Sequence, residues 1–212
     1  MTDWTLVRAC GLTKRWDASS GLRPVDLDVD RGEVVAVRGR SGSGKSTLVG
    51  LLAGWCEADA GTLEWPGLAE PASPRSWGNV AFAPQTIAPI VELSVVENVA
   101  LPLRCAGVGW RDALARARTL LAAVDLTEQA DRAADAVSLG QQQRMGVARA
   151  AIVEPALLVV DEPTSHQDAA HVASLAALFR MLARNGTACV IATHDAEIVK
   201  IADRIVDLDA PV

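Results

Sequence analysis

Four short apolar runs along the chain have the length and composition of β-strands. Residues 32–39 read GEVVAVRG, a valine-rich run bounded by glycines. Residues 156–160 and 188–192 are continuously apolar, as in strands that are buried on both faces, and residues 204–208 alternate more openly. We therefore expect a strand at each of these four places.

Helical patterns separate these runs. Residues 46–53 place three leucines on one helical face and are followed by Gly54, which is typical of a helix end, and residues 172–182 and 196–202 have similar patterns. Alternating strands and helices predict a mostly parallel sheet that helices cover on both faces. In such sheets ligands bind beyond the carboxyl ends of the strands, so the polar residues that follow each strand are candidate site residues.

The strand signal is absent between about residues 86 and 153, where we expect a helical insertion. An amphipathic helix with a period near 3.6 is indicated by four apolar residues, Leu114, Leu120, Leu121 and Val124. A second helix is predicted to begin at Ser138, because a glutamine, Gln141, follows three residues later as in a capping box. This helix would continue to residue 153, before Pro155.

Length and charge narrow the class of protein. The chain has 212 residues, of which 50% are hydrophobic, and its formal net charge is −6. This length suits one large domain. We expect no nucleic-acid partner, because domains that bind nucleic acids usually carry basic patches.

Apolar runs and cysteines indicate the compartment. Every apolar run is broken before the roughly 18 residues that a membrane-spanning helix requires. The first ten residues do not resemble a secretory signal, so we expect a cytoplasmic protein. The four cysteines, Cys10, Cys56, Cys105 and Cys189, show no disulfide or zinc-site spacing and are expected to be reduced thiols.

A phosphate-binding loop follows the first predicted strand. Residues 39–47 read GRSGSGKST, which matches the pattern G-x-x-x-x-G-K-[ST] between a strand and a helix. Its glycines allow backbone N–H groups to converge on phosphate oxygens, Lys45 would contact the β- and γ-phosphates, and Ser46 would bind Mg²⁺. The predicted nucleotide-binding residues are therefore Gly39, Arg40, Ser41, Gly42, Ser43, Gly44, Lys45, Ser46 and Thr47.

Two acidic residues end the apolar run at residues 156–160. Asp161 is expected to hold Mg²⁺ through water, and Glu162 to orient and polarise the attacking water. Beside a phosphate loop, this pair indicates nucleoside triphosphate hydrolysis, although the loop alone leaves kinases, GTPases and motor ATPases open.

Over nearly its whole length the chain resembles the ATP-binding subunits of ABC transporters. Gln85 in the sequence AFAPQ is similar to the family's glutamine loop, and residues 137–141 (VSLGQ) to its signature. Residues 165–168 resemble the dimer-interface loop, and His194 the switch histidine. Leu93 to Leu103, together with the run GQQQR, looks most like the branch that serves lipoprotein release and macrolide export.

The resemblance implies an α/β fold of the P-loop NTPase type. A mostly parallel central sheet would be accompanied by an N-terminal antiparallel β part and an inserted α-helical subdomain. Residues 1–212 would form one domain, with residues 1–86 and 154–212 as the nucleotide-binding core and residues 87–153 as the helical subdomain.

The resemblance also implies an ATPase that works as a dimer with Mg²⁺ and ATP. Two copies, expected to be a homodimer, would enclose two ATP molecules between the phosphate loop of one copy and the signature of the other. From the second copy the nucleotide would meet Ser138, Gly140, Gln141 and Asp168. Gln85 would bind Mg²⁺, His194 would hold the γ-phosphate, and an integral membrane permease would be the partner at the inner face of the membrane.

The family usually places an aromatic residue upstream of the phosphate loop to stack on adenine. Trp16 occupies the matching place. An indole offers at least as large a stacking face as a phenol, so Trp16 is the expected adenine contact.

Two departures from the family pattern leave alternatives open. Leu139 replaces the first glycine of the signature, where it would crowd the opposing γ-phosphate or change the local backbone, and His166 and Gln167 replace the usual middle pair of the dimer-interface loop. Gly146 inside the signature helix costs about 1 kcal/mol relative to alanine. The alternatives are an ATP-gated dimerising module with weak or no hydrolysis, which restoring glycine at Leu139 would distinguish, and a soluble ABC ATPase outside transport.

Overall fold

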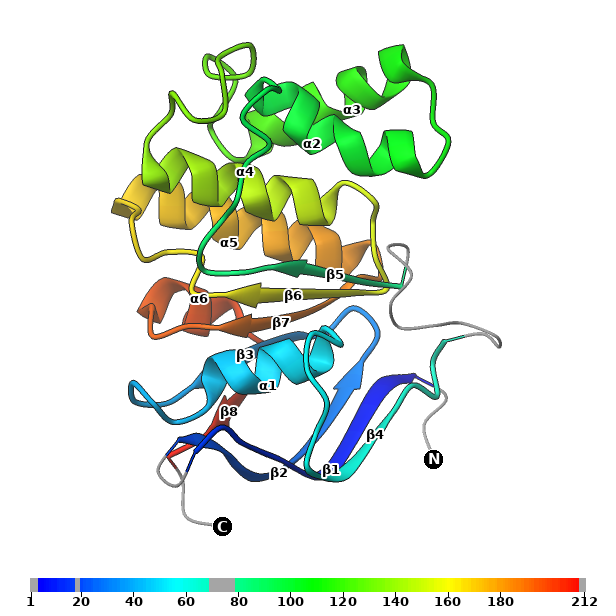
Figure 1. Ribbon diagram of the computed structural model, residues 1–212, viewed down its shortest axis with the longest axis vertical. Helices are drawn as coiled ribbons and strands as arrows, with labels where there is room; N and C mark the ends of the chain where they lie inside the picture. Colours follow the sequence, from blue (N-terminus) through cyan, green and yellow to red (C-terminus); the bar gives the residue numbers. More distant parts are fainter. Residues whose placement is uncertain (1–3, 18–19, 69–78, 210–212) are drawn as a thin grey trace.

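Two β-sheets form the framework of the protein (Figure 1). The computed structural model describes residues 4–17, 20–68 and 79–209, so the two ends of the predicted domain lie outside the described residues. In the five-stranded sheet the order is β5 (Val80–Ala83), β6 (Leu157–Asp161), β7 (Ala188–Ala192), β3 (Val34–Arg38) and β8 (Arg204–Asp207). In the three-stranded sheet the order is β2 (Gly21–Asp30), β1 (Thr5–Arg15) and β4 (Ala60–Glu64).

The predicted sheet types are confirmed. All neighbouring strands of the larger sheet are parallel, and those of the smaller sheet, near the N-terminus, are antiparallel. The four expected strands are β3, β6, β7 and β8. The apolar pattern did not locate β1, because bulges interrupt its pairing with β2 and β4 and its burial does not alternate regularly.

Helices and the smaller sheet cover the two faces of the parallel sheet, as expected. Because side chains alternate across a strand, Leu158 and Val160 of β6 join a core with the helices of one face. Leu157 and Val159 join a second core with α1 (Lys45–Leu52) and with strands β1 and β2. The carboxyl ends of the strands are thereby held between two packed layers.

Two helices, α2 (Val95–Cys105) and α3 (Trp110–Ala123), lie beyond α4 (Leu139–Ala151) in Figure 1. Helix α4 packs against both of them and against β5 and β6, so these three helices form one helical region beside the sheet. The division of the chain at residues 87 and 153 stays a prediction. No helix in the described ranges is long and apolar enough to cross a membrane.

The predicted helix boundaries are largely right. The capping box at Ser138 is present, since its side chain accepts from the N–H of Gln141 while Gln141 accepts in return. The helix after β6, α5 (Ala169–Arg184), begins earlier than predicted because Asp168 caps it. The helix after β7, α6 (Ala196–Ile201), matches its predicted start.

Packing explains the glycine in the middle of α4. A Cβ atom at Gly146 would lie 2.2 Å from Cδ1 of Ile87, in the segment that follows β5. An alanine would therefore displace Ile87, so the expected gain in helix propensity is offset by overpacking.

The cysteines behave as predicted, since all four are free. Cys189 lies in the core on β7, where burial raises the pKa of its thiol to about 12. A thiol with such a pKa is unreactive at neutral pH.

Candidate functional site

The phosphate loop connects β3 to α1 at the carboxyl edge of the parallel sheet. Gly44 caps α1 with a φ of 99°, and a Cβ atom there would lie 2.8 Å from the carbonyl oxygen of Gly21. Both observations require glycine. Because Gly44 has no side chain, no side chain caps this helix, and its first N–H groups are directed at the place where an anion would bind.

Lys45 is the first residue of α1 and is held over the loop. Its Nζ donates to the carbonyl oxygens of Gly39 (2.8 Å) and Arg40 (3.3 Å), and it lies 3.8 Å from Oε1 of Glu162. Both charged side chains are mostly buried. The ammonium group is thus positioned between the loop and the acidic end of β6.

Asp161, the last residue of β6, is a buried acid with an unused oxygen. The residue is only 7% exposed, and its Oδ1 is buried without a hydrogen-bond partner in the described part of the chain. Burial raises the pKa of Asp161, the hydrogen bond with Ser46 opposes this, and the nearby charge of Glu162 adds to it.

These features fit a Mg²⁺ ion. The orphaned oxygen of Asp161 and the hydroxyl of Ser46 are hard oxygen ligands beside each other. Among the described residues no group of three or more His, Cys, Asp or Glu side chains could hold a metal. Mg²⁺ would therefore bind through Ser46 and Asp161 together with phosphate and water oxygens, and it would neutralise phosphate charge.

Glu162 adopts an unusual backbone conformation. Its φ is 44°, in the left-handed region that costs a non-glycine residue on the order of 1–3 kcal/mol, and its N–H donates to the carbonyl oxygen of Ala192 (2.8 Å). Its Oε2 lies 3.0 Å from Nδ1 of the exposed His194. The turn after β6 thus directs this carboxylate between Lys45 and His194.

A cavity of about 590 Å³ connects these groups. It contains most of the predicted residues of one chain: Trp16, Gly39, Arg40, Ser41, Gly42, Gly44, Lys45, Ser46, Thr47, Gln85, Glu162 and His194. The side chain of Gln85 is exposed, and its carbonyl oxygen accepts from Nε2 of Gln143 (3.4 Å). The geometry is suited to a triphosphate with a water molecule near Glu162.

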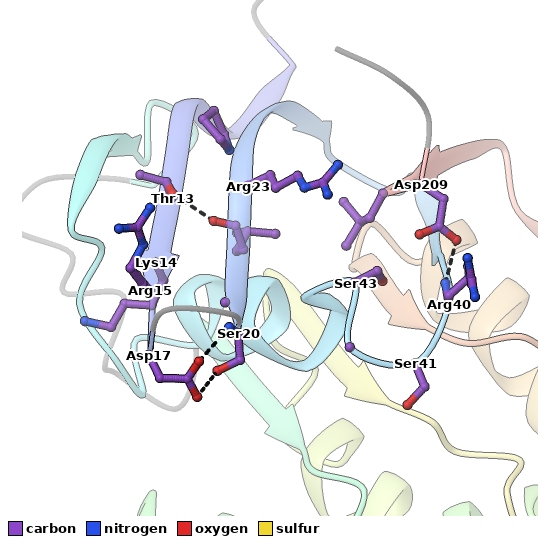
Figure 2. A pocket seen from close by; sticks show the side chains of 15 residues that line it. Thr13, Lys14, Arg15, Asp17, Ser20, Arg23, Arg40, Ser41, Ser43 and Asp209 are labelled. Carbon is purple, nitrogen blue, oxygen red and sulfur yellow. Dashed lines mark hydrogen bonds between the residues drawn. The ribbon is translucent and has the colours of Figure 1, made fainter.

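A second cavity, of about 680 Å³, shares part of the phosphate loop with the first and is drawn in Figure 2. Arg40, Ser41 and Gly42 line both cavities, whereas Ser43 lines only the second. The backbone N–H of Arg40 donates to Asp209 (2.6 Å), which anchors the loop to the chain after β8. Of the residues predicted for the site of one chain, Ser43 and Asp161 are therefore not among the described residues that line the first cavity. Asp161 is nevertheless hydrogen-bonded to Ser46, which does line it.

Trp16 lies at the rim of the first cavity and is 58% exposed. Its Nε1 donates to Oγ1 of Thr47 (3.0 Å), and Nζ of Lys14 lies 5.3 Å from the ring centre. The indole is thus oriented beside the loop, with accessible surface for a base.

We predict that Trp16→Ala weakens ATP binding about tenfold, because stacking of a base on an aromatic ring contributes roughly 1–3 kcal/mol. Titration with a fluorescent ATP analogue measures the effect. Trp110→Ala is the matched control, since Trp110 also lies under a cation, Arg104, but on α3. Equal affinities for both variants would remove Trp16 from the site.

The predicted residues of the signature and the dimer-interface loop lie elsewhere. Ser138 caps α4, and Asp168 caps α5, where it accepts from the N–H of His171 (3.0 Å). In the described part of the chain, neither they nor Gly140 and Gln141 line the first cavity. Their contact with a nucleotide stays a prediction that requires a second copy.

Leu139 is the first residue of α4 and is 64% exposed. It is not among the residues with positive φ, and the capping box beside it is intact. The expected distortion of the backbone is therefore absent at this residue, whereas crowding of an opposing phosphate stays a prediction.

Some residues near the site were not predicted to lie there, although residues 165–168 were singled out for their resemblance to the dimer-interface loop. Ser165 lines the first cavity, and Gln143 and Gln167 form hydrogen bonds beside it. Gln143 belongs to the GQQQR run, whose repeated glutamines were the available signal. The hydrogen bonds join distant parts of the chain, so no local pattern predicts them.

Comparisons of the sequence with known proteins all indicate the same family. Residues 22–165 match the ABC transporter family. A lipoprotein-releasing system ATP-binding protein, LolD 2 of Caulobacter vibrioides, is 42% identical, and the alignment covers 93% of this chain and 92% of that protein. The methionine import ATP-binding protein MetN of Rhizobium etli is 37% identical over 97% of this chain, which spans 59% of that longer protein.

Solved structures agree in fold. The dimeric ATP-binding cassette MJ0796, solved in a post-hydrolysis state bound to ADP and Pi, superimposes with a TM-score of 0.85. The two sequences are 26% identical, and the alignment covers 95% of this chain and 94% of that chain. With the phosphate loop and the acidic end of β6 placed on this fold, the chain belongs to the ABC transporter family as an ATP-binding domain.

Proposed function

We propose that the protein is the ATP-binding and ATP-hydrolysing subunit of an ABC transporter and powers transport by a separate membrane permease. The observation that carries this proposal is the arrangement of Lys45, Glu162 and His194 along one cavity at the carboxyl edge of the sheet. Asp161 forms a hydrogen bond with Ser46, which also lines this cavity. The similarity to ATP-binding proteins that cover nearly the same length supports it.

In this proposal the chain's own residues divide the work. Lys45 and the N–H groups at the start of α1 bind the phosphates. Glu162 accepts a hydrogen bond from the attacking water and polarises it, while His194, 3.0 Å from that carboxylate, orients it and contacts the γ-phosphate. Bound Mg²⁺ supplies charge neutralisation for the β- and γ-phosphates.

Two copies complete the site. Ser138 and Gly140 at the capped start of α4 would contact the γ-phosphate held by the second copy, since free N–H groups at a helix start favour an anion. Hydrolysis removes this phosphate and so releases the dimer. We propose a homodimer, which the dimeric state of the cassette MJ0796 supports.

An apolar groove would receive the permease. A cavity of about 420 Å³ lies between the end of α1, β5 and the helical region, and Trp55, Phe82, Ile90, Pro102 and Arg149 are among its lining residues. Trp55 is largely exposed and contacts Phe82 edge to face. An exposed aromatic residue in a groove is typical of a protein interface, and a permease bound there would hold the protein at the inner face of the membrane.

Co-expression with a candidate membrane permease, sought among the genes that neighbour this one, tests the function. We expect the purified chain to hydrolyse MgATP slowly and to co-purify with that membrane protein. Trp55→Glu is expected to reduce co-purification at least tenfold, because it places a charge in an apolar contact, while hydrolysis by the soluble protein is unchanged.

Exposed Trp110 on α3 provides the matched control, as Trp110→Glu. Dimerisation with ATP but without any turnover would instead indicate an ATP-gated module. Turnover by a chain with which no membrane protein co-purifies would indicate an ABC ATPase outside transport.

A further inference from the structure

The segment that follows β6 packs directly against the start of α4. A Cβ atom at Gly140 would lie 2.4 Å from the carbonyl oxygen of His166, so only glycine allows this approach. The two segments are distant in the sequence, and one carries Glu162 at its beginning while the other carries Ser138. The packing of the two segments therefore sets the position of Ser138 relative to Glu162.

Gln167 forms the central contact between these segments. Its Nε2 donates to the carbonyl oxygen of Gly140 (2.9 Å) and to Oε1 of Gln143 (3.4 Å). Its Oε1 accepts from Nη1 of Arg144 (2.6 Å). One side chain thus uses both its donor and its acceptor groups on the first turns of α4.

Gln143 extends the hydrogen bonds to the first cavity. Its Nε2 donates to Oγ of Ser165 (3.2 Å) and to the carbonyl oxygen of Gln85 (3.4 Å). The hydroxyl of Ser165 donates to the carbonyl oxygen of Glu162 (2.8 Å). A continuous path of hydrogen bonds therefore runs from Gly140 to the backbone of Glu162.

Two members of this network are buried. Gln143 and Arg144 are 6% and 4% exposed, and burial lowers the pKa of Arg144. The Nε of Arg144 is buried without a hydrogen-bond partner among the described residues, so its bond to Gln167 is a principal compensation for burying this cation. A buried polar network is stable only when its members are satisfied, so loss of one member affects the others.

We propose that Gln167 is a positioning residue that fixes the start of α4 relative to Glu162. The inference rests on the proposed function, in which the start of α4 contacts the nucleotide of the second copy while Glu162 acts on the nucleotide of its own chain. Gln167 then couples the geometry of the two sites of a dimer. Gln167 differs from the residue that the family usually has in this loop, and in this chain it has the positioning role.

Turnover, nucleotide affinity and dimerisation of Gln167→Leu test this proposal. We expect turnover of MgATP to fall by about 10²-fold, because a misplacement of about 1 Å has such an effect on catalysis. Affinity of the monomer for a fluorescent ATP analogue should stay within about twofold, since the phosphate loop is not touched. ATP-induced dimerisation, measured by light scattering in the Glu162→Gln background, should weaken.

Two further variants provide an intermediate case and a control. Gln167→Glu can still accept from Arg144 but cannot donate to Gly140, so its turnover should lie between those of the native protein and Gln167→Leu. It also serves if Gln167→Leu does not fold. The control is Gln129→Leu, which makes the same substitution in the segment between α3 and α4 and should leave turnover unchanged.

Two results would overturn the proposal: native turnover in both Gln167 variants, or a parallel loss of turnover and monomer affinity, which indicates general damage. The native chain separates this failure from that of the proposed function. If it neither hydrolyses MgATP nor dimerises with ATP, the proposed function itself is wrong.

Discussion

Glu162→Gln is expected to lower the turnover of MgATP by about 10²- to 10⁴-fold, the range that a general base contributes. An amide at this position cannot take up a proton from water, although it has nearly the same shape as the carboxylate. Removing the negative charge 3.8 Å from Lys45 should preserve or tighten ATP binding, because Glu162 then no longer competes with phosphate for the ammonium group. Phosphate release measures turnover, and size-exclusion chromatography with ATP should show an accumulated dimer.

A glutamate away from the cavity gives the control. Glu64 ends β4 in the antiparallel sheet and is exposed, so Glu64→Gln should leave both turnover and elution unchanged. Unchanged turnover in Glu162→Gln would mean that another group activates the water. A dimer that forms with ATP only in the Glu162 variant would agree with release by hydrolysis.

Asp161→Asn is expected to stabilise the protein without nucleotide and to abolish the stabilisation that MgATP gives. The pKa of Asp161 is raised in the folded protein, so its ionised form destabilises the fold at any pH above that raised pKa. The neutral amide removes this cost, and the free energy of unfolding without nucleotide should rise by about 1 kcal/mol at pH 7. The increase in thermal midpoint that MgATP produces in the native protein should be lost, because the Mg²⁺ ligand is gone.

The pH dependence distinguishes this cause from others. The gain from Asp161→Asn should shrink as the pH falls through the raised pKa and vanish below the ordinary pKa of aspartate, where both states carry a neutral carboxyl. Asp207 provides a control for which the opposite change in stability is expected, because hydrogen bonding to Arg38 lowers the pKa of its partly exposed carboxyl. Asp207→Asn should therefore lower stability slightly at pH 7. A loss of stability in Asp161→Asn would contradict the idea that the buried charge of Asp161 destabilises the protein.

Local patterns were sufficient for several parts of the fold. The strand, loop and helix around Lys45 could be predicted because glycine spacing and apolar periodicity depend on neighbours in the sequence. The same holds for the helix that begins after Ser138, whose capping box joins residues three positions apart. The strands β1, β2, β4 and β5 were not located, because their burial depends on pairing partners and bulges.

The candidate site, too, could be predicted from the sequence only in part. Each of Gln85, Glu162 and His194 could be named from a short motif, and residue types with their order along the chain are properties of the sequence alone. The contact between Glu162 and His194 joins residues 32 positions apart, and the strained φ of Glu162 depends on β6 and β7 lying side by side. The hydrogen bonds of Gln167 and the unpartnered oxygen of Asp161 likewise result from packing between distant segments. Such distances and burial are set by how the layers assemble, because short-range periodicity carries no information about which distant groups meet.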